Sequence, residues 1–300
     1  MTAVQASRRT SFKNVLFLTD FSEPSNEALP FATAIARGYG SKVHAVHVLV
    51  PSTYNYMTPE VAGSLLDDQE ELAQTEMARL ESRLIGLQHD VLIERGTGLW
   101  ETASELVKER DIDLVVLGTH GRTGFKKALF GSSAEEVFRR SRVPVLMSGP
   151  SARVGTHSGG RFRCVLLATD FNTVSSDAAK YAVSLAQENQ AQLILLHVLP
   201  TPKPGKSIRA GYLSVAEATH RLEDLVPPKA ELSCRPRAVV EHGEPAVQIL
   251  AAAKQCGADL IVMGVRGLNS LANISTRLQR DTAYEVVAHA LCPVLTIRGE

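Results

Sequence analysis

The sequence has no excess charge of either sign and no long hydrophobic run. Its 300 residues carry 32 Lys and Arg against 32 Asp and Glu, so the formal net charge is zero. This balance disfavours a nucleic-acid platform or a binder of anionic membranes, because both depend on a strong basic field. No apolar stretch approaches the roughly 18 residues of a membrane-spanning helix. We therefore expect neither nucleic acid nor membrane as a partner.

Cysteine is also scarce, and the first half of the chain has none. The four cysteines are Cys164, Cys234, Cys256 and Cys292. They show no CxxC spacing, which indicates reduced thiols rather than a disulfide framework. The first 14 residues lack the apolar stretch of a signal peptide. Together these features predict a cytoplasmic protein.

Several catalytic motifs are missing as well. There is no GxxxxGKS or GxxxxGKT phosphate loop, no GxSxG elbow and no HExxH spacing. The sequence therefore argues against a P-loop ATPase, an esterase and a zinc hydrolase. His47 and His197 lie within apolar runs and are interpreted as core histidines with a backbone partner. Trp100, the single tryptophan, begins a helical pattern and is interpreted as a packing residue.

The sequence repeats itself at an offset of about 150 residues. The matched segments are, in order, 14–21 with 164–171, 43–49 with 193–199, 113–118 with 259–264, and 143–146 with 292–295. Four matches in the same order indicate a duplicated domain. We expect one domain at 1–149 and another at 161–299. Residues 150–160 are rich in Gly and Ser and are expected to form a linker.

Within each copy, short apolar runs alternate with helical patterns. In the first copy, strands are expected at Val15–Thr19, Lys42–Leu49, His89–Glu94, Leu114–Gly118 and Val145–Ser148. Helices are expected at Glu23–Arg37, Glu60–Leu87, Leu99–Glu109 and Ser132–Arg140. The strand runs are mostly continuous, as in parallel strands covered on both faces. The pattern predicts an α/β protein with two doubly wound, five-stranded parallel sheets, whose ligands bind beyond the carboxyl ends of the strands.

The last strand of each copy should lie at an edge of its sheet. An unpaired apolar edge promotes aggregation, and neither Val145–Ser148 nor Val294–Arg298 has a charge in its middle. Antiparallel pairing of these two strands would satisfy both edges, and duplication supplies the near-symmetry that such a contact requires. We therefore expect the two copies to pair as an intramolecular pseudo-dimer. The sequence leaves open whether two such chains also associate into a homodimer.

A glycine-rich loop follows the fourth expected strand. Gly118 and Gly121 begin it, and Gly131, Ser132 and Ser133 end it at the start of a helix. Glycines there would let the backbone approach a ligand and direct N–H groups at an anion. A helix N-terminus favours phosphate, and the serines can cap the helix or donate hydroxyls to the phosphate. The alternative is three turn glycines and an ordinary serine cap.

On these motifs both halves resemble universal stress protein domains. The family pattern Gly-x2-Gly-x9-Gly-Ser/Thr matches Gly118, Gly121, Gly131 and Ser132. The Thr-Asp pair that ends the first strand, the His-Val pair and the Pro-Val-Leu opening of the last strand are each present twice. The resemblance implies a Rossmann-like sheet similar to the adenine-nucleotide α-hydrolase fold. It also implies ATP binding, with Mg or another divalent ion as a cofactor.

Carried over residue by residue, the resemblance implies a nucleotide site in the first copy. Around adenine and ribose it would include Leu18, Thr19, Asp20, Val48 and Leu117; around the phosphates it would include Gly118, Gly121, Arg122, Gly131, Ser132 and Ser133. Asp20 could also cap the next helix, a role that can coexist with ligand contact, and Arg122 could simply be an exposed loop residue. No metal ligand is expected from protein side chains, and no catalytic residue is assigned.

The second copy departs from the pattern. After Gly264 and Gly267, the spacing of nine residues reaches Arg277 instead of glycine. Aligned on the final helix, Arg280, Asp281 and Thr282 replace Gly131, Ser132 and Ser133. A bulky Arg and an Asp at the helix N-terminus oppose phosphate binding, because the carboxylate already occupies the favourable end of the helix dipole. We expect a structural role or a different ligand for this copy.

The resemblance therefore implies an ATP-binding stress-response protein that is regulatory rather than strongly catalytic. One alternative is a slow ATPase or an autophosphorylating enzyme, although no paired base and water-positioning group stands beside the glycines. The second alternative is an interaction module that does not use nucleotide, in which the glycine loop is only a turn.

Overall fold

The computed structural model describes residues 12–50, 59–119, 130–153, 161–201, 213–265 and 282–298. The strands of the first half are β1 (Asn14–Leu18), β2 (Lys42–Leu49), β3 (His89–Arg95), β4 (Leu114–Gly118) and β5 (Val145–Ser148). Its helices are α1 (Glu23–Tyr39), α2 (Pro59–Ser82), α3 (Leu99–Glu109) and α4 (Ser132–Arg140). Apart from α2, these elements begin and end within two residues of the expected positions.

The second half repeats the alternation of strands and helices. Its strands are β6 (Cys164–Ala168), β7 (Gln192–Leu199), β8 (Arg237–His242), β9 (Leu260–Val265) and β10 (Val294–Arg298). Its described helices are α5 (Thr173–Asn189), α6 (Val215–Asp224), α7 (Pro245–Cys256) and α9 (Thr282–His289). The α/β class expected from the sequence is confirmed.

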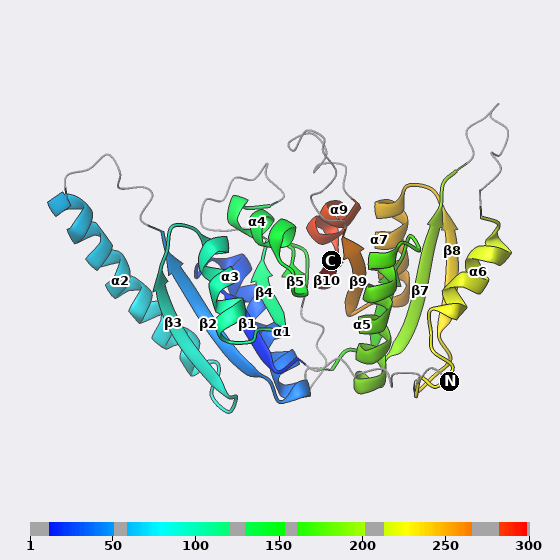
Figure 1. The fold of residues 1–300 in the computed structure, drawn as a ribbon, viewed down its shortest axis with the longest axis horizontal. Helices are drawn as coiled ribbons and strands as arrows, with labels where there is room; N and C mark the ends of the chain where they lie inside the picture. The colour runs from blue at the N-terminus through cyan, green and yellow to red at the C-terminus, as the bar shows by residue number, and fades with distance from the viewer. Residues whose placement is uncertain are drawn as a thin grey trace, which may run out of the picture.

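The two five-stranded sheets join into one sheet of ten strands. The order is β3-β2-β1-β4-β5-β10-β9-β6-β7-β8, with the first half on the left of Figure 1 and the second on the right. Every neighbouring pair is parallel except β5 and β10, which run antiparallel and place Leu146 opposite Leu295. The hydroxyl of Thr296 adds a hydrogen bond of 3.2 Å to the Val145 carbonyl. The expected pairing of the last strands is confirmed.

Helices cover both faces of this sheet, which explains the continuous apolar strands. One face packs under α1, α2, α5 and α6, and the other under α3, α4, α7 and α9. The buried cluster on each face contains residues from both halves. Phe12 makes one such link, because its ring lies 5.3 Å from Tyr39 and 6.3 Å from Tyr181 of the second half.

Helix α1 begins and ends at clear local signals. Ser22 is the N-cap and accepts a hydrogen bond from the Ser25 amide, and Pro24 stands in the first turn, where its missing N–H costs nothing. Gly40 ends the helix with a left-handed φ of 67°.

Helix α2 is shorter than expected. The sequence predicts a helix over Glu60–Leu87, but the helix ends at Ser82. After that point Arg83 and Leu84 donate to carbonyls three residues back, at 2.9 Å each, which tightens the chain into a turn. Gly86, with a φ of 86°, then turns the chain toward β3.

The expected linker starts as a packed segment. The Arg153 amide donates to the Leu291 carbonyl at 3.0 Å. Just before the linker, a Cβ on Gly149 would collide with the Val287 carbonyl. Residues 154–160 lie outside the described part of the chain, and the boundaries 1–149, 150–160 and 161–299 stay a prediction. None of the helices in the described ranges is long and apolar enough to cross a membrane.

Candidate functional site

Most of the candidate residues lie along one edge of the first sheet. Strand β1 lies between β2 and β4, so the carboxyl ends of these three strands meet there. The candidates at or just beyond those ends are Leu18, Thr19, Asp20, Val48, Leu117 and Gly118. Gly131, Ser132 and Ser133 lie at the start of α4. Gly121 and Arg122 belong to the segment 120–129, which is outside the described residues.

The turn after β1 is built around Asp20. Its Oδ1 accepts hydrogen bonds from the Ser22 amide at 3.1 Å and from the Ser22 hydroxyl at 2.6 Å. Ser22, and not Asp20, is the N-cap of α1. The interpretation of Asp20 as a helix cap was therefore wrong. Asp20 instead bonds to Ser22 in the turn that precedes the helix. These bonds hold its carboxylate at the carboxyl edge of the sheet.

A buried histidine, His47, is hydrogen-bonded to the backbone of the same turn. His47 Nδ1 lies 2.8 Å from the Thr19 carbonyl, and because a carbonyl only accepts, this nitrogen carries the proton. The His47 ring packs on Phe21 at a centroid distance of 4.5 Å. Phe21 has a φ of 62°, a left-handed conformation that costs a non-glycine residue about 1 kcal/mol or more. The contacts of Phe21 with its neighbours hold it there.

The second half repeats this arrangement. His197 Nδ1 lies 2.8 Å from the Thr169 carbonyl, and its ring packs on Phe171 at 4.3 Å. Phe171 has a φ of 60°. The interpretation of both histidines as core residues with a backbone partner is confirmed. Sequence reasoning missed the two phenylalanines, although the repeated Thr-Asp-Phe triplet contained the signal.

The glycine-rich loop starts and ends at the same place. The Gly131 amide donates to the Thr119 carbonyl at 2.8 Å, and the Thr119 amide donates to the Ser148 carbonyl at 3.1 Å. The first residues of α4 are thereby attached to the carboxyl end of β4.

Gly131 is the N-cap of α4, so neither serine caps the helix. Its φ of −72° and ψ of 146° are open to any residue, and as a glycine it has no side chain to cap the first amides of this helix. Ser132 and Ser133 are exposed in the first turn. Amides and hydroxyls of this kind can hold an anion such as phosphate.

Gly118 has a packing role that the sequence did not reveal. A Cβ at this position would lie 2.5 Å from the carbonyl oxygen of Pro24 and 2.7 Å from its carbonyl carbon. The first turn of α1 therefore lies directly against the end of β4. Gly264 repeats this contact less tightly, with the Ser175 amide nitrogen at 2.9 Å. A ligand is not the only reason for glycine here.

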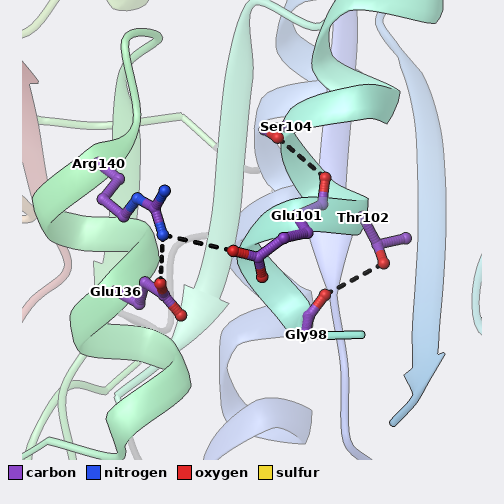
Figure 2. A network of polar contacts seen from close by, with 6 residues as sticks. All are labelled: Gly98, Glu101, Thr102, Ser104, Glu136 and Arg140. Atoms are coloured by element: carbon purple, nitrogen blue, oxygen red, sulfur yellow. Dashed lines mark hydrogen bonds and ion pairs between the residues drawn. The ribbon is translucent and has the colours of Figure 1, made fainter. Parts of the chain in front are cut away.

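Helix α4 is attached to its neighbour α3 by polar contacts. Arg140 lies 2.5 Å from Glu136 of its own helix and 3.4 Å from Glu101 of α3, as Figure 2 shows. Its guanidinium also lies over the Trp100 ring at 5.5 Å. These exposed ion pairs contribute about 1 kcal/mol or less each. Their effect is to fix the orientation of α4, and the packing role expected for Trp100 is confirmed.

The second half also contacts the start of α4. The ring of Phe130, the residue before Gly131, stacks on Tyr284 of α9 at 4.3 Å and 22°. Figure 1 shows α4 and α9 side by side at the centre of the molecule. No motif in the sequence pointed to this contact, since Phe130 and Tyr284 are far apart along the chain.

The corresponding turn in the second half differs in its hydrogen bonds. Asp170 Oδ1 accepts from the Asn172 amide at 3.2 Å and from the Ser175 hydroxyl at 2.7 Å, and Oδ2 accepts from the Asn172 side chain at 3.0 Å. The carboxylate is thus bonded to the start of α5. The loop residues that motivated the contrast between the copies (Gly267, Arg277, Arg280 and Asp281) lie outside the described residues, and Thr282 begins α9.

Metal-binding capacity is limited in the described part of the chain. No group of three or more His, Cys, Asp or Glu side chains there is arranged to hold a metal ion.

The model of the universal stress protein family matches twice, at residues 11–148 and 161–298. The chain belongs to the universal stress protein family. Its two matches cover both copies, so it is a tandem member with two domains of this family.

Individual relatives agree with this organisation. Universal stress protein YxiE of Bacillus subtilis is 31% identical over 150 residues, which cover 46% of this chain and 99% of YxiE. Universal stress protein Slr1230 of Synechocystis is 24% identical over 308 residues, which cover 95% of this chain and all of Slr1230. A universal stress protein structure from Archaeoglobus fulgidus has a TM-score of 0.70 at 21% identity and covers 95% of this chain and 98% of its own. That likeness supports the fold alone.

Proposed function

We propose that this universal stress protein binds one ATP per chain, together with Mg or another divalent ion, at the carboxyl edge of its first domain. The bound nucleotide regulates the protein's part in a stress response, and strong catalysis is not its role. Adenine and ribose lie near Asp20 and Val48, and the phosphates lie at the start of α4.

The single observation that carries this proposal is the start of α4. Gly131 at the N-cap has no side chain to cap the first amides of the helix, and the hydrogen bond from its amide to Thr119 attaches this end to β4. A helix N-terminus with open amides attracts phosphate through N–H groups and through the helix dipole. Beyond the neighbouring strand β1, Asp20 offers a carboxylate acceptor for a sugar hydroxyl or an exocyclic amine.

The asymmetry between the domains supports a single site. Arg280 and Asp281 stand in the second copy where Gly131 and Ser132 stand in the first. A carboxylate at the helix N-terminus competes with phosphate for the same favourable field. The second domain then contributes to packing, including the stack of Tyr284 on Phe130.

Calorimetric titration of the full-length protein with ATP and MgCl2 tests the proposal. The expected stoichiometry is near one nucleotide per chain. Gly131→Val should weaken binding by about 2–3 kcal/mol, or roughly 30- to 150-fold, because its side chain enters the phosphate space. The backbone at Gly131 accepts valine, so the variant should remain folded.

Gly38→Ala is the matched control. Gly38 lies on α1, where an added Cβ would meet no atom within 4 Å, so ATP affinity should not change. Wild-type affinity in folded Gly131→Val would show that the phosphate assignment is wrong. A stoichiometry near two would contradict the asymmetry between the domains.

A further inference from the structure

Three of the four cysteines gather at the other edge of the second domain. Cys164 is the first residue of β6, Cys256 ends α7, and Cys292 precedes the start of β10. This is the edge at which the strands of the second domain begin, opposite to their own carboxyl ends. Cys164 and Cys292 are buried, with 5% and 4% of their surface exposed, and Cys256 is half-buried.

Backbone contacts hold the two elements of this cluster together. The Asp259 amide, three residues after Cys256, donates to the Cys164 carbonyl at 2.9 Å. The Asp259 carboxylate in return accepts from the amides of Arg163 at 2.6 Å and Cys164 at 3.1 Å. The end of α7 is thereby attached to the start of β6. Cys256 packs against the buried cluster that contains Cys164 and Cys292.

The first domain has the same scaffold without the thiols. Asp113 accepts from the amides of Lys13 at 2.7 Å and Asn14 at 3.3 Å, as Asp259 does in the second domain. In the repeat, the positions of Cys164, Cys256 and Cys292 correspond to Asn14, Arg110 and Val143. The backbone arrangement therefore requires no cysteine, and the three thiols are a feature of the second domain alone.

The two neighbouring thiols differ in their chemistry. The neighbouring Cys164 thiol lowers the pKa of Cys256 to about 7, and the Cys256 thiol also lies 3.6 Å from the Ala253 carbonyl oxygen. A lowered pKa favours the thiolate, which is the nucleophilic form of cysteine. The interaction with Cys256, together with burial, raises the pKa of Cys164 and keeps it protonated. Burial raises the pKa of Cys292 to about 12. The groups around the pair thus single out Cys256, the most exposed of the three, as the reactive sulfur.

We propose that Cys256 and Cys164 form a peroxide-sensitive dithiol that closes reversibly to an intramolecular disulfide. The Cys256 thiolate attacks one oxygen of hydrogen peroxide; an S–O bond forms, the O–O bond breaks, and the leaving hydroxide takes a proton to become water. The Cys164 sulfur then attacks the Cys256 sulfenic acid. The S–S bond forms, the S–O bond breaks, and the departing hydroxyl leaves as a second water with the Cys164 proton. Two thiols lose two electrons, and the peroxide gains them.

Peptide mapping of the oxidised full-length protein tests this proposal. The protein is treated with hydrogen peroxide, alkylated and digested with trypsin without reduction. Residues 164–180 and 255–266 are the tryptic peptides that contain the two cysteines. They should appear as one linked species, and dithiothreitol should separate them. Cys256→Ser should abolish the linked species, whereas Cys234→Ser, which changes an exposed cysteine outside the cluster, should leave it unchanged.

A second variant keeps the order of the two steps testable. In Cys164→Ser, the sulfenic acid on Cys256 has no resolving thiol and should be trapped by dimedone. Circular dichroism checks that both variants remain folded, and if Cys164→Ser does not fold, Cys256→Ser and the wild type still decide the outcome. Irreversible oxidation of Cys256 without the linked peptides would overturn the proposal. So would a link between Cys256 and Cys292, or a reaction confined to Cys234.

Discussion

Gly118→Ala should destabilise the first domain through a backbone collision. The added Cβ would lie 2.5 Å from the Pro24 carbonyl oxygen, 2.7 Å from its carbon and 3.0 Å from the Ser25 nitrogen. All three atoms belong to the backbone of the first turn of α1, so no side-chain rotation relieves the contact. Overpacking of this kind costs about 1–3 kcal/mol. The melting temperature of the first domain should then fall by roughly 2–12 °C.

The chain supplies its own comparisons for this measurement. Gly264→Ala meets its nearest atom at 2.9 Å, so the same change in the second domain should cost less. Gly38→Ala meets nothing within 4 Å and removes a glycine from the last turn of α1, so it should be neutral or stabilising by up to about 1 kcal/mol. Differential scanning calorimetry of the three variants gives the order. Equal melting temperatures for Gly118→Ala and Gly38→Ala would refute the close approach of α1 to β4.

Two further predictions concern the sheet and a buried histidine. In hydrogen exchange, the paired amides of β5 and β10 should exchange more slowly than those of the edge strands β3 and β8, and rapid exchange at β5 would contradict the continuous sheet. Burial lowers the pKa of His44 below its usual 6.5, so the unfolded chain takes up a proton first as the pH falls. The free energy of unfolding should therefore decrease below about pH 6.5, by at most about 1.4 kcal/mol per pH unit, and less in His44→Gln. Urea titrations at several pH values measure the free energy of unfolding of both proteins. The same dependence of this free energy on pH in the wild type and in His44→Gln would refute the prediction.

Much of the fold could be predicted because the same order of apolar runs and motifs occurs twice in the chain. The apolar runs predicted the strands of the first half to within a residue, and the uncharged last strands predicted the junction of β5 with β10. The end of α2 could not be predicted, because the helical spacing continues to Leu87 while the chain has already tightened after Ser82.

The candidate site was predictable only in part. The positions of Asp20 and Gly131 followed from the motifs, but their local roles did not. That Ser22 caps α1 depends on where the turn ends, and that Gly118 contacts Pro24 depends on how a helix crosses a strand far away in the sequence. The same holds for Cys164 and Cys256, which only the fold brings together.

Photoaffinity labelling of the full-length protein tests the central claim most directly, because it reports where the nucleotide binds. With 8-azido-ATP and MgCl2, the azide on the adenine ring should label the tryptic peptides 14–37 and 43–79, which contain Asp20 and Val48. Excess ATP should suppress the labelling, and Gly131→Val should reduce it. Labelling of the corresponding second-domain peptides, 164–180 and 181–206, or labelling that excess ATP does not suppress, would contradict a nucleotide site in the first domain.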